Sequence, residues 1–224
     1  MPVRMAVPKE TISGEQRVAL DPTMAERFTK LGVEILVEKG AGLSAFFTDE
    51  AYGKSSRLVD GVQALYAEAD VVFKVQGPTL EEVELLKDGS VLLAVLSPHR
   101  NPDVVKRLRD KKITSFAMEL IPRISRAQSM DVLSSQAAVA GYFVALRAAS
   151  LASGFFPMLT TAAGTIRPSK VVIVGAGVAG LQAIATAKRL GAMVEAYDIR
   201  PAARQEIESL GAKMIDTGVN AAAE

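Results

Sequence analysis

The sequence predicts an α/β protein with two parallel-sheet units joined by a long helix. Short runs of Val, Ile and Leu alternate with stretches of helical spacing, which is typical of parallel strands covered by helices on both faces. The alternation occurs twice, over residues 3–117 and 170–215, and an alanine-rich stretch lies between. The 224 residues are 49% hydrophobic and 23% charged, with a formal net charge of +1. That composition is typical of a globular protein and not of a disordered one.

The first unit is expected to contain strands at residues 3–7, 33–37, 71–75, 91–96 and 113–117, with helices at residues 22–31, 62–69, 80–87 and 102–110. The first helix has clear boundary signals. Asp21 and Pro22 are typical of an N-cap and a first helical position, and Gly32 is typical of a helix end. We therefore expect residues 1–129 to form a flavodoxin-like or Rossmann-like α/β domain.

The middle of the chain predicts a connector, made of a polar loop at residues 123–129 and a long helix at residues 130–153. The helix and a short linker would together occupy residues 130–160. Ala137 to Thr160 is apolar enough to suggest a membrane span, but Arg147 near its middle would cost about 2.5–3.5 kcal/mol there. We therefore expect a buried helix rich in small residues and no membrane span in this chain.

The second unit is expected to have strands at residues 171–174, 193–197 and 213–215, with helices at residues 178–190 and 202–210. A complete dinucleotide-binding domain of the Rossmann type has six strands in two halves. Only the first half is predicted over residues 161–224. The second unit is therefore expected to be truncated, and the chain to be a fragment of a longer protein.

Several classes of function are excluded by composition. The sequence has no Cys and a single His, His99, which excludes disulfides, thiol nucleophiles, iron–sulfur clusters and zinc sites built on Cys and His. No metal site is predicted, and redox chemistry would need a cofactor. The near-zero net charge gives no reason to expect a nucleic-acid partner. Pro8 interrupts the apolar start that a secretory signal would need, so we predict a cytoplasmic protein.

Three glycines at the spacing G-x-G-x-x-G lie between a predicted strand and a helix expected to begin at Val178. Gly175 would permit the tight turn, Gly177 would let a pyrophosphate approach the backbone, and Gly180 would let helix and strand pack closely. The helix N-terminus would supply N–H donors and a partial positive charge. The pattern predicts dinucleotide binding, and the alternative is a purely structural turn.

Asp198 ends the next predicted strand, about 20 residues after the glycines, where an acidic residue typically accepts a hydrogen bond from the ribose. A carboxylate beside the 2′ position favours a free hydroxyl and repels a phosphate, so NAD is predicted over NADP. Ile199 and Arg200 complete the candidate cofactor-binding set. Arg200 could instead stabilise a 2′-phosphate, or it could be a solvated side chain.

A second group of polar side chains gathers over residues 122–136, between the two predicted units. Dinucleotide sites lie in clefts of this kind. Asp131 and Ser134 are three residues apart, so they share one face of the helix start. The alternative is that Ser129 or Asp131 only caps the long helix.

The motifs together resemble a known family. Residues 123–136, RISRAQSMDVLSSQ, followed by the glycine turn and by YDIR at residues 197–200, are similar to the NAD(H)-binding domain I in the alpha subunit of proton-translocating nicotinamide nucleotide transhydrogenases. The resemblance covers essentially the whole chain. It includes VPKE at residues 7–10 and QRVAL at residues 16–20, which that family shares with alanine dehydrogenases.

The resemblance implies a site and a reaction. Arg123, Gln128, Asp131 and Ser134 match the residues at the nicotinamide end of the family's site. Gln128 would reach toward the partner's nucleotide, while Asp131 and Ser134 would orient the carboxamide and ring. Hydride would pass directly from NADH to the oxidised form of the NADP(H) on domain III of the beta subunit, and protons would cross through membrane domain II. The resemblance also implies a homodimer, in the cytoplasm and peripheral to the inner membrane.

Two alternatives remain open. Alanine dehydrogenases are similar through Arg17 and Lys74, but their catalytic His would fall on Ser97, and His99 lies two residues later in a turn-rich segment. His99 is also the one candidate proton acceptor for oxidation of an alcohol or amine, although such a segment suits a loop residue equally well. The other alternative is a noncatalytic nucleotide-binding module.

Overall fold

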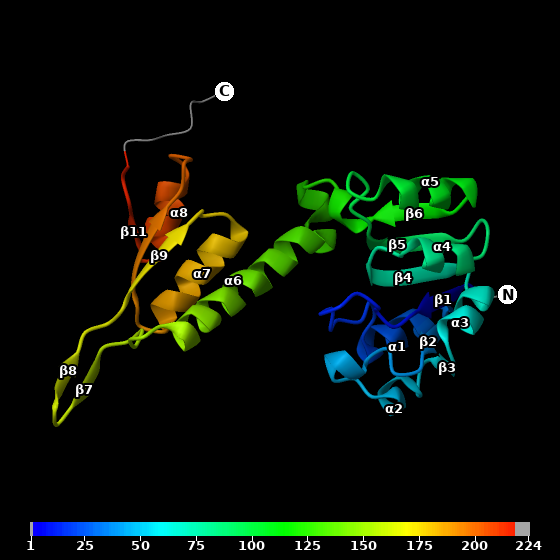
Figure 1. Cartoon of the computed structure of the whole chain (residues 1–224), viewed down its shortest axis with the longest axis horizontal. Coiled ribbons are helices and arrows are strands. Elements are labelled where there is room, and N and C mark those ends of the chain that lie inside the picture. The colour runs from blue at the N-terminus through cyan, green and yellow to red at the C-terminus, as the bar shows by residue number, and fades with distance from the viewer. Residues whose placement is uncertain (1, 218–224) are drawn as a thin grey trace. The chain divides into compact units, whose positions relative to one another are not determined.

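The computed structural model describes residues 2–217 and divides into two compact units between residues 131 and 132 (Figure 1). Each unit contains a parallel sheet with helices packed on it. The α/β class and the two parallel sheets expected from the sequence are confirmed. We call residues 2–131 the first unit and residues 132–217 the second unit.

The first unit is built on a six-stranded sheet in which every neighbouring pair of strands is parallel. Its order is β3-β2-β1-β4-β5-β6. The strands are β1 (Arg4–Val7), β2 (Glu34–Glu38), β3 (Arg57–Val59), β4 (Val71–Gln76), β5 (Val91–Val95) and β6 (Thr114–Ala117). The order reverses between β1 and β4, and ligands of open α/β sheets bind beyond the carboxyl ends of the strands at such a point.

Helices connect these strands. They are α1 (Pro22–Lys30), α2 (Asp49–Tyr52), α3 (Val62–Glu68), α4 (Leu80–Leu85) and α5 (Pro102–Asp110), with short 3₁₀ turns η1 (Leu43–Ala45), η2 (Met118–Leu120) and η3 (Ser125–Met130). Helix α1 starts as expected, because the Asp21 carboxylate accepts a hydrogen bond from the backbone N–H of Met24 at 2.9 Å. Helix α2 and strand β3 were not expected from the sequence.

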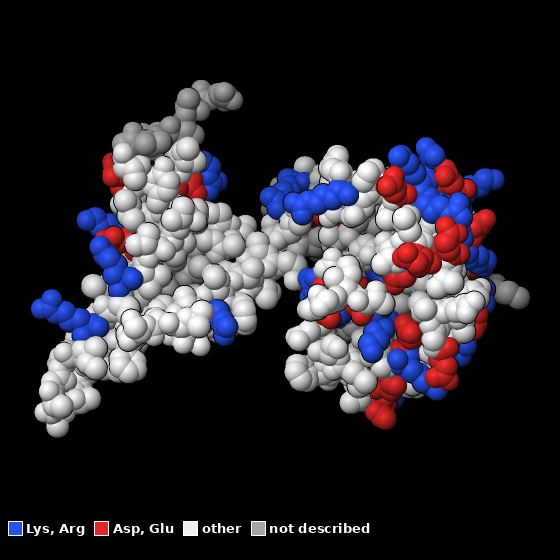
Figure 2. Space-filling model, in the orientation of Figure 1, with Lys and Arg blue, Asp and Glu red and all other residues white. Residues whose placement is uncertain are grey.

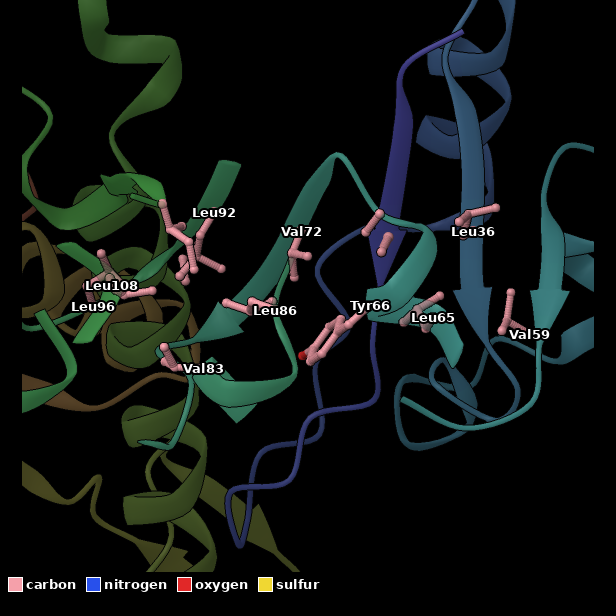
Figure 3. Packing of buried hydrophobic residues seen from close by; sticks show 14 residues of the cluster. Leu36, Val59, Leu65, Tyr66, Val72, Val83, Leu86, Leu92, Leu96 and Leu108 are labelled. Carbon is pink, nitrogen blue, oxygen red and sulfur yellow. The ribbon is translucent and has the colours of Figure 1, made fainter. Parts of the chain in front are cut away.

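The core of the first unit lies on both faces of the sheet. Successive residues of a strand point to opposite faces. Accordingly, Ala6 and Leu36 belong to one buried cluster, whereas the adjacent Val7 and Val37 belong to the other. Figure 3 shows the first of these clusters, in which side chains from α3, α4 and α5 meet those of the strands. The sheet is therefore covered on both faces, as its nearly continuous apolar strands predict.

The second unit has a three-stranded parallel sheet of order β11-β10-β9. Its elements are α6 (Val132–Leu151), β7 (Leu159–Thr161), β8 (Gly164–Ile166), β9 (Lys170–Val174), α7 (Val178–Arg189), β10 (Met193–Tyr197), α8 (Ala203–Ser209) and β11 (Lys213–Met214). Strands β7 and β8 pair with each other as an antiparallel hairpin, which was not expected. The core gathers apolar side chains of α7, α8, β10 and β11.

The expectation that the long helix is buried is wrong for the described chain. Only Gly141 and Ala145 of α6 are buried. Gly141 lies where α6 meets α7, since a Cβ there would collide with the backbone carbonyl of Ala179. By length and apolar composition alone, α6 is also the one described helix that could cross a membrane. The sequence predicted correctly that this helix is apolar, but it did not predict that most of the helix is exposed within the described residues.

Candidate nucleotide-binding site

Two of the three glycines in the turn between β9 and α7 are required by the fold itself. Gly175 has a φ of 95°, a left-handed conformation that residues with a side chain rarely adopt. At Gly180 a Cβ would collide with the backbone carbonyl of Gly175. These glycines allow the chain to reverse at the end of β9 and α7 to pack closely against the turn.

Gly177 is not required by the fold. Its φ of −76° and ψ of −170° are available to any residue, and a Cβ there would meet nothing within 4 Å. The space in front of its backbone is therefore open to a ligand. Gly177 is the N-cap of α7, and within residues 2–217 no side chain caps that helix end. The first N–H groups of α7, from Val178 onward, are suited to bind an anion.

Asp198 follows β10 directly and lies against this turn. The carboxylate is buried, and its Oδ2 accepts a hydrogen bond from the backbone N–H of Ala176 at 2.7 Å. Its Oδ1 accepts from the backbone N–H of Arg200 at 2.8 Å. The structure therefore brings together the glycine turn and the acidic residue that the sequence singled out. The contribution of Ala176 was missed, because a backbone donor leaves no sequence signal.

The Arg200 side chain covers the same carboxylate. Its Nε donates to Oδ1 of Asp198 at 2.9 Å and its Nη2 donates to Oδ2 at 3.1 Å. This guanidinium, assisted by the two backbone donors and opposed by burial, holds the pKa of Asp198 well below its ordinary value. Ile199 and Val178 are each about half exposed, at 47% and 45% of the residue surface.

The polar segment at residues 122–136 is more regular than expected. Residues predicted as an irregular loop form η3, and Asp131 directly precedes α6. Arg123 and Asp131 form an ion pair in the first unit, with Nε and Oδ2 3.7 Å apart. Gln128 is exposed, and its backbone carbonyl accepts a hydrogen bond from the backbone N–H of Asp131 at 3.2 Å. Ser134 is half-buried in the first turn of α6, in the second unit.

The segment after β5 offers no buried histidine. His99 is exposed in a turn. Ser97, two residues after the end of β5, has a φ of 46°, and its backbone N–H donates to the Glu119 carboxylate at 2.5 Å. That carboxylate also accepts from the N–H of Leu96 at 3.2 Å. Glu119 therefore fixes an unusual backbone conformation at the position where a catalytic His was sought.

A buried charged cluster lies at the carboxyl ends of β1 and β4 and was not predicted as a unit. The Lys74 ammonium is 2.9 Å from Oε1 of Glu82 and 3.7 Å from Oε2 of Glu10. All three side chains are nearly inaccessible to solvent. Glu82 forms a capping box with Thr79 at the start of α4, and even this sequence-visible motif would not have indicated the pairing with Lys74.

Arg17 is also paired within the first unit. Its guanidinium donates to Glu15, with Nη2 and Oε2 2.6 Å apart, and Gln76 donates to the same Oε2 at 2.7 Å. The Arg17 contact lowers the pKa of Glu15 to about 2. Both cations that suggested an alanine dehydrogenase, Lys74 and Arg17, therefore have carboxylate partners in this chain.

Comparison with protein families gives two matches that together cover nearly the whole chain. Residues 6–140 match the N-terminal domain of the alanine dehydrogenase/PNT family, and residues 144–224 match its C-terminal domain. The family resemblance expected from the sequence motifs is confirmed.

Individual relatives agree with these matches. The chain is 49% identical over 220 residues to an NAD(P) transhydrogenase subunit alpha protein of Rhodospirillum rubrum, covering 95% of this chain and 57% of that protein. It is 34% identical over 199 residues to alanine dehydrogenase of Methanococcus maripaludis, covering 87% and 53%. A transhydrogenase structure from Sinorhizobium meliloti superposes with a TM-score of 0.91 at 44% identity, covering 96% and 62%. The chain thus spans between half and two thirds of the length of these three proteins.

Proposed function

This chain belongs to the alanine dehydrogenase/PNT family, and from that membership we propose that it is the NAD(H)-binding part of a proton-translocating NAD(P) transhydrogenase. The observation that carries this proposal is the glycine turn joined to Asp198 through the 2.7 Å hydrogen bond from Ala176. This pairing supports the proposal, because the N-terminus of α7, which is suited to bind a phosphate, lies beside the carboxylate that we propose as the ribose acceptor. Identity of 49% to a transhydrogenase alpha subunit supports the assignment.

The residues of the second unit fit a dinucleotide. The N-terminus of α7 would hold the pyrophosphate, since the space in front of Gly177 is open and the first turn of α7 presents N–H donors. Asp198 would accept from the adenosine ribose, and the exposed faces of Val178 and Ile199 would lie beside the adenosine half. A carboxylate here favours NAD(H) over NADP(H).

We further propose that Arg123, Gln128, Asp131 and Ser134 position the nicotinamide end. Bound NADH would supply the hydride and become NAD⁺, and the oxidised form of the NADP(H) held by the beta subunit would accept it. Transfer between two nicotinamides exchanges no proton at the reacting carbon. The protein then needs to orient two rings and not to supply an acid or base. The exposed Gln128 and the Arg123–Asp131 ion pair are suited to orient a nicotinamide ring. The exposed His99 is not needed as an acid or base in such a transfer.

The proposed setting is a complex at the membrane. The partners would be the NADP-binding domain III of the beta subunit and membrane domain II, with this part as a homodimer on the cytoplasmic side of the inner membrane. Charged side chains of both signs are interspersed over the right-hand part of the first unit in Figure 2. We propose no nucleic-acid partner, since phosphate binding needs Lys and Arg in clear excess and the formal net charge is +1.

The test is a titration of the chain with NADH and NADPH, followed by nucleotide fluorescence. We expect NADH to bind more tightly than NADPH. We expect Asp198→Ala to weaken NADH binding by about 1.5–3 kcal/mol, the range for a hydrogen bond to a charged group. Glu195→Gln is the matched control, because Glu195 lies on β10 and pairs with Lys170 at 2.9 Å, away from the turn. Equal affinity of wild type and Asp198→Ala for NADH would remove Asp198 from the ribose site.

An alanine dehydrogenase remains the second candidate, favoured by the buried Lys74 at the end of β4. The structure around it argues for the first candidate, since Lys74 and Arg17 are held by carboxylates and Ser97 stands where the catalytic His was sought. We expect no oxidation of NADH by pyruvate plus ammonium when the full-length protein is tested, monitored at the NADH absorbance band. Turnover that rises with pyruvate concentration would reverse the order of the two candidates.

A further inference from the structure

The hydrogen-bonding capacity of Asp198 is filled by residues of the chain itself. A carboxylate offers about four acceptor positions, two on each oxygen. Oδ1 receives the backbone N–H and the Nε–H of Arg200, and Oδ2 receives the backbone N–H of Ala176 and Nη2 of Arg200. Among residues 2–217, these four donors leave no position for a ribose hydroxyl.

The four donors are not equally fixed. Ala176 is completely buried in the turn, and the adjacent Gly175 donates its N–H to the carbonyl of Tyr197 at 2.7 Å. The backbone N–H of Arg200 is held by its position two residues after Asp198. The guanidinium, by contrast, ends a flexible side chain that is 57% exposed. It is the one donor group that can leave without moving the backbone.

The guanidinium donates as many hydrogen bonds to Asp198 as the two hydroxyls of a ribose could donate. Its Nε and Nη2 each place one hydrogen bond on one carboxylate oxygen, and Nη2 also donates to the backbone carbonyl of Ala176 at 3.3 Å. The adjacent 2′- and 3′-hydroxyls of a ribose can donate in the same way, one to each oxygen. Removal of the guanidinium therefore frees the number of acceptor positions that a ribose diol needs, while the two backbone donors stay in place.

We propose that Arg200 is a specificity-determining residue, which occupies the ribose position in the free protein and is exchanged for the ribose diol when a nucleotide binds. The inference rests on the proposed function, because it concerns the same nucleotide. After exchange the guanidinium remains near the 2′ position, since its backbone N–H stays on Oδ1. Arg200 thus competes with NADH and offsets the repulsion between Asp198 and the 2′-phosphate of NADPH. Arg200 therefore reduces the preference for NADH over NADPH that Asp198 creates.

The decisive variant is Arg200→Met, which keeps an unbranched side chain and removes the fork. We expect NADH to bind roughly three- to tenfold more tightly, since it no longer displaces an ion pair to a largely buried carboxylate. NADPH should bind more weakly than to wild type. The melting temperature without nucleotide should fall, because the free protein loses the pair. A purely structural role would lower both stability and NADH affinity, so the opposite signs identify competition.

Two further variants serve as controls. Arg204→Met makes the same replacement on α8, where the side chain faces Glu208 and Asp216, and should change neither nucleotide affinity. Arg200→Lys keeps the charge without the bidentate fork. It should gain NADH affinity while retaining more of the NADPH affinity than Arg200→Met does.

The outcomes separate the two proposals. If wild type binds NADH and Arg200→Met binds it equally or more weakly, the exchange is wrong and the NAD(H) function stands. If neither protein binds NADH or NADPH while both melt cooperatively, both proposals are overturned. Tighter NADH binding together with a lower melting temperature supports the exchange.

Discussion

Gly180→Ala should disrupt the second unit, with loss of NADH binding as a consequence. The added Cβ would collide with the backbone carbonyl of Gly175, and neither atom belongs to a flexible side chain. Relief would require α7 to move away from the end of β9. We expect the free energy of unfolding of this unit to fall by about 3 kcal/mol, at the upper end of the cost of overpacking. Hydrogen exchange of peptides from β9 and α7, measured by mass spectrometry, checks this.

Gly177→Ala is the matched control, since it adds the same methyl group three residues earlier in the turn. Its Cβ would stand in open space, and its backbone conformation suits alanine. The weaker N-cap and the smaller entropy of the unfolded chain oppose each other, so stability should stay within about 0.5 kcal/mol of wild type. NADH affinity should nevertheless fall, because the methyl group occupies the space open to the phosphates. Equal destabilisation by both variants would contradict the distinction between Gly180 and Gly177.

Local sequence signals were sufficient for much of the fold. The strand expected at residues 193–197 coincides with β10, and the signals at Asp21 and Pro22 mark the start of α1. Helix α2 and strand β3 were missed, because four and three residues are too few to show a period. Their stability comes from tertiary contacts, such as the hydrogen bond from the buried Tyr52 hydroxyl to the Leu20 carbonyl at 2.7 Å.

The candidate site also contains features that the sequence could predict and features that it could not. The glycine turn and Asp198 were predictable, because adjacent parallel strands bring their carboxyl ends together. The bidentate contact of Arg200 was not, because spacing does not decide whether a long side chain extends into solvent or folds back onto a neighbouring carboxylate. Composition likewise did not reveal that α6 is largely exposed in the described chain. Whether an apolar helix is buried depends on contacts with residues that are distant in the sequence.

The buried cluster around Lys74 is another set of contacts between residues that are distant in the sequence, and we expect it to contribute strongly to the stability of the first unit. Lys74 comes from β4, Glu10 follows β1 and Glu82 belongs to α4. The Glu10 carboxylate accepts from the N–H of Val75 at 2.6 Å, and Glu82 accepts from the N–H of Thr79 at 2.9 Å. One buried ammonium thus faces two buried carboxylates whose other partners are neutral N–H groups. The cluster joins two neighbouring strands and a helix at the point where the strand order of the first sheet reverses.

Lys74→Met should therefore destabilise the first unit by about 3–5 kcal/mol, the cost of removing one partner from a buried ion pair. The methionine fills similar volume, so the loss reports the uncompensated carboxylates and not a cavity. Denaturant unfolding followed by circular dichroism measures the change. We expect the folded fraction of Lys74→Met to keep binding NADH, because Asp198 and the glycine turn lie in the second unit and Lys74 lies in the first.

Two comparisons test the electrostatic origin of this loss. Lys87→Met removes a lysine that is also paired, with Asp70 at 3.1 Å, but whose side chain is 47% exposed. It should cost no more than about 1 kcal/mol. The double variant Lys74→Met with Glu82→Gln removes one buried negative charge along with the ammonium, so it should be more stable than Lys74→Met alone. If the second substitution instead lowers stability further, the cost of Lys74→Met arises from packing, and the two carboxylates are not destabilised by loss of the lysine.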